Sequence, residues 1–363
     1  MGRRKMRMPE TVSELIGKIK SSSEAPCKVM EVCGTHTKAI AESGIADLVR
    51  PAIHLVSGPG CPVCVTSKNY IDIAIQLLKM PQIIIATFGD MMKVTGSDGS
   101  LMSKSEYRNR IAILYSPLDA LTLAKKHKEK EIVFLAVGFE TTAPIIALMI
   151  KTAKVHNICN LSVLSGLKRM EPVLHKILSE KNINIRGILC PGHVAAVMGA
   201  NYFSFITHQY HIPAVIAGFE PYDIIMALYD LFRQQEKGTP HFKNLYRSVV
   251  SDQGNQKAIE MMEEVFEEGE AGWRGIGVIA NSGMAFREEY QQFDVYHRFT
   301  IQEVDNSEMD ACICSQILLG KKLPVECIYF GKRCTPDTPI GPCMVSYEGA
   351  CSINYQWRDG QDE

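Results

Sequence analysis

The chain alternates short runs of β-branched and other apolar residues with amphipathic stretches, and this alternation limits the fold more than any other feature. Such runs predict buried strands, and the stretches between them predict helices that cover parallel strands. The expected strands are Lys28–Val32, Ile53–Val56, Gln82–Thr87, Ile111–Tyr115, Glu131–Val137, Leu161–Leu164, Ile185–Cys190 and Ala214–Ala217. The expected helices include Lys68–Leu78, Pro117–Lys126, Ala143–His156, Glu171–Leu178 and Pro221–Gln234. We therefore predict an α/β fold built on parallel sheets.

Three short elements recur in the same order along the chain, which favours an internal repeat over a chance likeness between two α/β halves. The first copy consists of residues 32–36, 57–61 and 85–90, and the second of residues 138–142, 189–193 and 216–220. We predict two similar α/β lobes, 27–130 and 131–238. Their strand-end loops would face a shared cleft, because open α/β sheets bind ligands at the carboxyl ends of their strands.

The pattern changes after residue 238. Ser251–Glu270 is a polar, acidic stretch that predicts a helix, and Trp273–Phe286 is Gly-rich and strand-like. From Asp310 onward the sequence is dense in Cys, Pro and Gly. We predict a third domain, 239–363, which packs with an N-terminal helix (Glu10–Lys20) within residues 1–26.

Length and charge narrow the class of protein. A chain of 363 residues can form two or three domains with their own cores. A formal net charge of -1 gives no reason to expect nucleic acid or an anionic membrane as a partner. No stretch approaches the ~20 consecutive apolar residues that span a bilayer, and no apolar signal core follows the basic start Met1–Lys5. We therefore expect a cytoplasmic protein, in which clustered members of the 12 cysteines bind metal or do redox chemistry more often than they form structural disulfides.

One candidate site lies early in the chain. Cys61-Pro62-Val63-Cys64 follows a strand and a Gly-rich turn, and Val65–Leu78 is expected to be helical. Thiols at a helix N-terminus favour the thiolate form, and two of them can close a disulfide or chelate a soft metal. Cys33 and His36 follow another strand, and if the two strands are neighbours, Cys33 lies close to the CxxC pair.

The tail carries a second candidate site. Cys327, Cys334, Cys343 and Cys351 lie in a loop-like segment rich in Pro and Gly, which lets thiolates converge on one centre. Structural zinc is the alternative, but its ligands usually come in CxxC pairs, which this segment lacks. Cys312 and Cys314 also compete for the ligand places, and spacing does not decide among the six.

These motifs together resemble the HypD family of [NiFe]-hydrogenase maturation proteins. The resemblance covers nearly the whole chain, in the family's order, through Cys33–Thr37, Gly58–Cys64, Thr87–Met92, Tyr115–Ala120, Gly138–Thr142, Pro191–Val194, Ala217–Pro221, Trp273–Gly277 and Cys334–Cys351. Lys38 and the loop Leu167–Pro172 depart from the family pattern, which weakens any transfer of a role to residues there.

The resemblance implies a scaffold with redox chemistry rather than a turnover enzyme. The iron unit Fe(CN)2CO of the hydrogenase would be built on it, with a small HypC-type chaperone and a HypE-type cyanide carrier as partners. By resemblance, Cys33, Cys61 and Cys64 hold iron and take part in thiol redox, with His36 beside them. Cys327, Cys334, Cys343 and Cys351 would bind a [4Fe–4S] cluster, which leaves Cys312 and Cys314 without a ligand role.

These assignments combine into one hypothesis: the cluster reduces a Cys61–Cys64 disulfide, and the freed thiolates hold iron together with Cys33. The repeat adds cleft candidates, with His193 aligned to Cys61 and Glu140 beside the position of Cys33, and with Asp90, Glu220 and Asp223 as polar lining. Capping or packing is the alternative role for each.

The rival functions are a thiol–disulfide oxidoreductase with an Fe–S cluster, a binding protein with structural zinc, and a nucleotide-dependent enzyme. The last is disfavoured because the chain has no GxxxxGK[ST] loop and no GxGxxG fingerprint.

Overall fold

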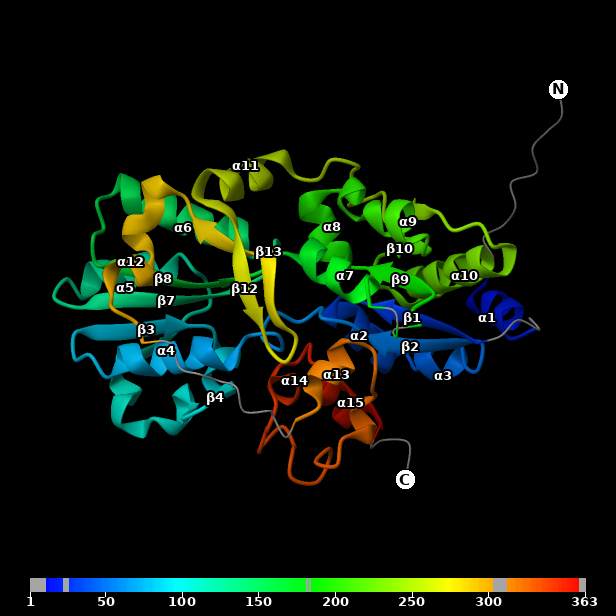
Figure 1. The fold of residues 1–363 in the computed structure, drawn as a ribbon, viewed down its shortest axis with the longest axis horizontal. Coiled ribbons are helices and arrows are strands. Elements are labelled where there is room, and N and C mark those ends of the chain that lie inside the picture. Colours follow the sequence, from blue (N-terminus) through cyan, green and yellow to red (C-terminus); the bar gives the residue numbers. More distant parts are fainter. Residues whose placement is uncertain (1–10, 22–25, 181, 183, 303–311, 359–363) are drawn as a thin grey trace.

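The computed structural model describes residues 11–21, 26–180, 182, 184–302 and 312–358. Within them, two parallel sheets lie end to end, with the cysteine-rich tail against their junction (Figure 1). The five-stranded sheet has the order β11-β10-β9-β1-β2, and the four-stranded sheet the order β6-β3-β7-β8. The five strands are β1 (Cys27–Glu31), β2 (Ile53–Ser57), β9 (Gly187–Cys190), β10 (Ala214–Ile216) and β11 (Phe242–Asn244). The four are β3 (Ile83–Thr87), β6 (Ile111–Ile113), β7 (Glu131–Gly138) and β8 (Leu161–Leu167).

Helices cover both faces of each sheet, which is why central strands such as β3 and β7 are apolar and buried along most of their length. On the five-stranded sheet one face is covered by α1 (Val12–Lys20), α2 (Gly34–Glu42), α3 (Ile45–Leu48) and α10 (Pro221–Lys237). Its other face is covered by α7 (Met170–Leu178), α8 (Gly192–Met198), α9 (Phe205–Tyr210) and the tail. The four-stranded sheet has α4 (Lys68–Leu78) on one face, and α5 (Asp119–Lys126) and α6 (Ala143–Val155) on the other.

The predicted elements are confirmed at the level of single strands and helices. Each of the eight predicted strands and each of the five predicted helices between them overlaps an observed element of the same type. The unpredicted strand β11 has three residues, too few for a clear pattern. A small hairpin of β4 (Thr95–Gly96) and β5 (Gly99–Ser100) was also not predicted.

The two sheets do not follow the predicted lobes 27–130 and 131–238. Each sheet takes two strands from the first range and two from the second, because the chain crosses from one sheet to the other after β2 and returns after β8. The repeat elements 85–90 and 138–142 both follow strands of the four-stranded sheet, whereas the other four follow strands of the five-stranded sheet. The predicted pairing of one lobe with one sheet was therefore wrong.

The ends of the chain are also arranged differently from the prediction. Helix α1 packs on α10, where Leu15 and Ile19 join Leu228 and Leu231 in one apolar cluster, and not on the cysteine-rich tail. Thr11 and Glu14 form a capping box that begins α1. Glu10 and the basic start Met1–Lys5 lie outside the described residues.

The described residues of the range 239–363 (239–302 and 312–358) do not form one unit. Strand β11 belongs to the five-stranded sheet, while α11 (Gln256–Val265) and the hairpin of β12 (Phe266–Trp273) and β13 (Gly277–Phe286) pack against the α6 side of the four-stranded sheet. The expected helix over 251–270 ends at Val265, because a strand begins at Phe266. Helix α12 (Val295–Arg298) follows the hairpin, and α13 (Cys314–Leu318), α14 (Pro342–Val345) and α15 (Ala350–Arg358) make up the tail (Figure 1).

Among the described residues, no helix has both the length and the apolar character needed to cross a bilayer.

Candidate functional site

The carboxyl ends of β1, β9 and β10 gather loops at one edge of the five-stranded sheet. In the order β11-β10-β9-β1-β2 the chain runs outward in both directions from the boundary between β1 and β9. Such a boundary is where open α/β sheets bind ligands, because the loops on its two sides diverge. Cys33 follows β1 and His193 follows β9, so these two predicted residues flank the boundary.

Cys33 lies beside the loop that carries the CxxC pair, as expected if the two preceding strands were neighbours. Strands β1 and β2 pair in parallel, and Gly34 N–H donates to the carbonyl oxygen of Gly60 at 3.4 Å. A Cβ atom on Gly60 would clash with the Cys33 backbone, so a glycine is needed for the two loops to approach. The strand pairing therefore brings Cys33 and the Cys61 loop together.

Cys33 is a buried thiol at the start of a helix. It is the N-cap residue of α2 and is 6% exposed. Burial raises the pKa of Cys33 to about 12, with a smaller contribution from the charge of Glu31, although the N–H groups of His36 and Thr35 act in the opposite direction. A metal ligand must lose this proton, so iron binding at Cys33 would release a proton.

Glu31 organises this loop and was missed by the sequence analysis. One carboxylate oxygen accepts from Cys33 N–H at 3.0 Å, and the other accepts from the Thr37 hydroxyl at 2.5 Å. Burial raises the pKa of Glu31 to about 7, and these hydrogen bonds oppose the rise. The loop geometry at Cys33 thus depends on a buried acid.

His36 is fully buried, and one of its ring nitrogens has no partner. Nε2–H donates to the carbonyl oxygen of Gly218 at 3.0 Å, which leaves Nδ1 as an unpartnered acceptor. Burial lowers the pKa of His36 to about 4. Phe219 lies between two imidazoles, with ring centroids 4.6 Å from His36 and 4.2 Å from His193. His193 is exposed, so the outer side of this stack faces solvent.

Cys61 and Cys64 lie at disulfide distance, with Cα atoms 5.3 Å apart. Cys64 N–H also donates to the Cys61 sulfur at 3.2 Å. The expected helix start was wrong, because α4 begins at Lys68 with Ser67 as its N-cap, and the cysteines occupy a turn before it. The two thiols are 3% and 0% exposed, so they are closed to large substrates in this conformation.

All six tail cysteines line one small cavity. Cys312, Cys314, Cys327, Cys334, Cys343 and Cys351 surround it together with Ile313, Ile317, Phe330 and Met344. Burial raises the pKa of Cys351 above its usual range, and the charges of Cys312, Cys334 and Cys327 raise it further, which indicates that these sulfurs are close together. A side chain at Gly341 would collide with the Cys312 sulfur, and one at Gly349 would collide with the Cys343 backbone.

The sulfur donors of the cavity are suitable ligands for a soft metal group, but the geometry does not show which four of the six cysteines would bind it. The predicted ligands Cys327, Cys334, Cys343 and Cys351 all line it, and so do Cys312 and Cys314. Cys343 is at disulfide distance from Cys314, and no three Cys, His, Asp or Glu side chains in the described part of the chain have the arrangement of a metal site. The donor set consists of thiols in an apolar cavity, which fits the ligand chemistry of iron–sulfur clusters.

The two thiol sites, treated as separate in the sequence, are in contact. The Cys64 sulfur lies 3.9 Å from the carbonyl oxygen of Pro342, the residue before Cys343. Cys61, Cys64, Cys334 and Cys343 belong to one apolar cluster at the junction of the sheets.

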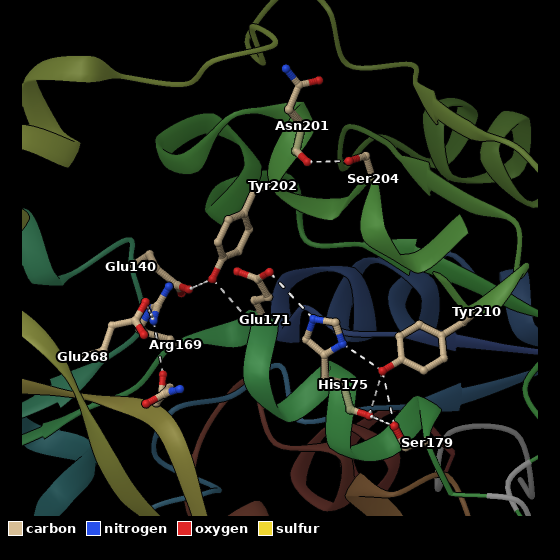
Figure 2. Close-up of polar contacts among 11 residues, drawn as sticks. Glu140, Arg169, Glu171, His175, Ser179, Asn201, Tyr202, Ser204, Tyr210 and Glu268 are labelled. Carbon is tan, nitrogen blue, oxygen red and sulfur yellow. Dashed lines mark hydrogen bonds and ion pairs between the residues drawn. The ribbon is translucent and has the colours of Figure 1, made fainter. Parts of the chain in front are cut away.

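The remaining predicted cleft residues have other surroundings. Glu140 is buried after β7, and it accepts from Tyr202 O–H at 2.6 Å (Figure 2). It also accepts from Met170 N–H at 2.8 Å. Burial raises the pKa of Glu140, and its second carboxylate oxygen has no hydrogen-bond partner. These contacts tie β7 to helices of the other sheet and favour a structural role. Figure 2 also shows Arg169 paired with Glu268 of the hairpin.

Asp90 and Glu220 also lie at carboxyl ends of strands. Asp90 follows β3 in a short 3₁₀ helix, Gly89–Lys93, where partial burial raises its pKa. Glu220 is exposed at the start of α10, and its side chain makes no capping hydrogen bond. Asp223, one turn later, has a pKa raised by burial and by the charge of Glu220. In the part of the chain described, no hydrogen bond or ion pair links Asp90 to the Cys33 loop.

Glu348 of the tail was missed entirely. Its carboxylate accepts from the Thr35 hydroxyl at 3.1 Å, and a Cβ on Gly34 would meet its side chain. Its charge also raises the pKa of His193, whose pKa is lowered overall by burial. Because Glu348 and Thr35 are 313 positions apart, no local pattern connects them.

Comparison with known proteins gives consistent matches over nearly the whole chain. The family model described as "HypD: Hydrogenase formation hypA family" matches residues 10–358. Hydrogenase maturation factor HypD of Escherichia coli K12 is 37% identical over 365 residues, which cover 98% of each protein. Hydrogenase maturation factor HypD1 of Bradyrhizobium diazoefficiens is 39% identical over 350 residues, covering 94% of this chain and 92% of that protein. The HypD factor of Rhodobacter capsulatus is 37% identical over 351 residues, covering 95% and 93%.

Proposed function

The chain belongs to the HypD family of hydrogenase maturation proteins, and from this premise we propose that it is a scaffold on which the Fe(CN)2CO unit of [NiFe]-hydrogenase is assembled. The iron unit is the cargo, and Cys33, Cys61 and Cys64 are its proposed ligands. The observation that carries the proposal is the meeting of three elements at the sheet junction: the Cys33 loop, the CxxC pair and the six-thiol cavity.

The ligand chemistry supports this assignment. Thiolates are soft ligands, suited to iron that also carries cyanide and CO. The Cys33 thiol lies at the N-cap of α2, and the unpartnered His36 Nδ1 lies on the first turn of the same helix. Glu31 holds the Cys33 N–H, so the thiol is presented from a fixed loop. In this role His36 orients the site as a neutral imidazole.

The redox step requires the Cys61–Cys64 pair to change state. The S–S bond breaks when it takes up two electrons and two protons, and it yields two thiols. A [4Fe–4S] cluster held by four tail cysteines would supply these electrons one at a time. An external one-electron donor of low potential would reduce the cluster again after each transfer. On losing their protons, Cys61 and Cys64 then bind the incoming iron with Cys33. The contact between Cys64 and Pro342 supports a short path between the two sites.

The proposed partners follow from the same premise. A small HypC-type chaperone would exchange the iron unit, and a HypE-type carrier would deliver cyanide. Both must reach Cys33, and the exposed ring of His193 marks the side of the site that faces solvent.

The test is an infrared spectrum of protein purified without oxygen, because CN and CO stretching bands have few other biological sources. The Cys61→Ser/Cys64→Ser protein is expected to lose these bands, and Cys159→Ser, which changes an exposed cysteine, is expected to keep them. Bands of full intensity in the double variant would show that the pair does not hold the iron unit.

The ligand set of the tail cavity needs its own test. The four predicted ligands and the two remaining cysteines can be compared by single serine variants, with iron and sulfide content and visible absorbance as the measurements. We expect Cys334→Ser to lose the absorbance and Cys312→Ser to retain it. Retained absorbance in Cys334→Ser would exclude that thiol as a ligand, and zinc without absorbance in the unmodified protein would exclude a cluster.

A thiol–disulfide oxidoreductase is the second candidate function, because Cys61 and Cys64 lie at disulfide distance. Their burial opposes it, since an attacking thiolate must reach an exposed sulfur. Catalytic reduction of insulin disulfides at a rate typical of oxidoreductases would support this alternative.

A further inference from the structure

A cavity that the proposed function does not use lies along the outer edge of the five-stranded sheet. Strand β2 is the last strand in the order β11-β10-β9-β1-β2, so among the described strands its outer edge has no neighbour. Helices α2 and α3 border the cavity on one side. The tail borders it on the other side, through Ile317 of α13 and through Ile353 and Trp357 of α15. Figure 1 shows these tail helices beside α2 and β2.

The cavity contains an arginine that lacks an acceptor. Arg50 lines it, and its Nε atom is buried without a hydrogen-bond partner. In the part of the chain that the structure describes, its side chain makes no ion pair either. Arginine is always charged, and leaving a buried donor of a charged group unpaired is unfavourable. A guanidinium binds a carboxylate through two parallel hydrogen bonds, so an organic anion would supply the missing acceptor.

Two acidic side chains also line the cavity, and neither pairs with Arg50. Asp47 is exposed and lies one turn before Arg50, and no ion pair joins the two among the described residues. Glu31 is buried, and its two oxygens already accept from the Cys33 N–H and the Thr37 hydroxyl. The guanidinium is therefore the group in this cavity whose hydrogen bonds are incomplete.

Much of the remaining wall is apolar. Ile40 and Leu55 contribute to it from the sheet side, and Ile317 and Ile353 from the tail. The cavity has a volume of about 110 Å³. A cavity of roughly 150 Å³ holds benzene, so this one has room for a body of about four to six carbon atoms. Trp357 stands at the cavity with 41% of its surface exposed.

We propose that this cavity binds a small organic carboxylate, with the carboxylate group on Arg50 and a short apolar chain against Ile40 and Ile353. Such a ligand contacts the sheet edge and the tail at once, and it therefore strengthens the attachment of the tail to the sheet. The residues that line the cavity include no cysteine among those described, so the inference does not depend on the iron unit.

The test uses butyrate as the probe, because it combines a carboxylate with a short apolar chain. Trp357 reports binding by its fluorescence, since the other tryptophan of the chain, Trp273, is 1% exposed and lies in the hairpin. At constant ionic strength we expect a saturable change with a dissociation constant in the millimolar range, because so small a ligand has few atoms that can contribute binding energy. Trp357→Phe is expected to abolish this change.

Two comparisons test the role of the charge. Butyramide has nearly the same shape as butyrate without its charge, and it should bind about tenfold more weakly because it cannot form the charge-assisted pair. R50Q should weaken butyrate binding by a similar factor. R108Q is the matched control, since it removes the same charge from an exposed position in the 3₁₀ helix Ser105–Arg110, and it should leave butyrate binding unchanged.

The absence of a saturable response to butyrate would overturn the inference, and so would equal binding of butyrate by folded R50Q and the unmodified protein. Inorganic phosphate that binds as tightly as butyrate would also overturn it, because the site would then recognise charge without an apolar chain. If R50Q does not fold, the comparison of butyrate with butyramide on the unmodified protein decides the matter.

Discussion

The carboxyl edges of the two sheets offer the same topology but different chemistry. Each sheet has one boundary from which the chain runs outward both ways, between β1 and β9 in one and between β3 and β7 in the other. Cys33 and His193 lie at the boundary of the five-stranded sheet. Asp90 and Glu140 lie at the boundary of the four-stranded sheet, where Glu140 is hydrogen-bonded to Tyr202. Topology therefore provides two places for a site, and side-chain chemistry favours one of them.

The strongest test of this contrast is Cys33→Ser, which keeps the size of the side chain and removes the soft ligand. We expect complete loss of the CN and CO infrared bands from the purified protein, because an alcohol is a poor ligand for the proposed iron unit. Measurement of bound iron together with the bands separates lost cargo from lost protein. Wild-type bands in this variant would remove Cys33 from the site.

Protonation of His36 should make the five-stranded edge acid-sensitive. Its pKa is lowered to about 4 in the folded protein. As the pH falls below the ordinary pKa of histidine, the unfolded chain therefore binds a proton at this residue that the folded protein does not. The resulting stability is fully present above that value and is lost as the pH falls, by about 3 kcal/mol between pH 6.5 and 4.

Denaturant midpoints measured across this pH range check the prediction. His36→Gln keeps a donor for the Gly218 carbonyl and does not titrate, so its midpoint should vary less with pH. Equal pH dependence in the two proteins would mean that other groups cause the acid sensitivity.

Tyr202→Phe tests whether the four-stranded edge is structural. The change removes a hydroxyl that donates to Glu140 and accepts from Glu171 N–H, so it should lower the free energy of unfolding by about 1–3 kcal/mol. The infrared bands of the folded variant should persist. If stability is unchanged while the bands disappear, the comparison between the edges breaks down.

Gly34→Ala tests the contact between Glu348 and the start of α2, next to Cys33. The new methyl group would meet the Glu348 side chain, whose Cγ would lie at 3.0 Å, so the tail must shift away. Alkylation of Cys33 by iodoacetamide should become severalfold faster. Gly17→Ala in α1 is the control, because a methyl group there meets nothing within 4 Å. An unchanged alkylation rate in Gly34→Ala would mean that the tail accommodates the methyl group.

The smallest effect is expected for Asp90→Asn. Asp90 occupies a strand-end loop of the four-stranded sheet, comparable to that of Cys33, and if chemistry rather than topology selects the site, the infrared bands should be unaffected. Loss of the bands would show that both edges take part in holding the cargo.

Strand and helix positions could be predicted because β-branched runs such as Ile83–Thr87 are buried on both faces and end at clear turn residues. The sheet to which each strand belongs could not be predicted, because parallel strands pair through the same backbone pattern whichever part of the chain supplies them. The helix start after Cys64 was misplaced although Ser67, a residue type favoured at N-caps, marks the true start.

Part of the candidate site was also predictable. The closeness of Cys33 to the CxxC loop followed from two neighbouring strands. The roles of Glu31 and Glu348 did not follow, because a carboxylate is an ordinary surface residue until its burial and partners are known. The tail contact with Cys64 depends on residues 278 positions apart, beyond any local signal.

The repeated crossing of the chain between the sheets has a consequence for synthesis. Strand β1 lies inside its sheet, with β2 on one side and β9 on the other, and residue Val29 pairs with Gly187. A growing polypeptide thus holds an unfinished sheet edge next to Cys33 until more than half of it has been made. Contacts this distant in sequence slow folding and leave exposed edges prone to wrong pairing. The thiol site can be completed only when the last helices, those of the tail, have been added.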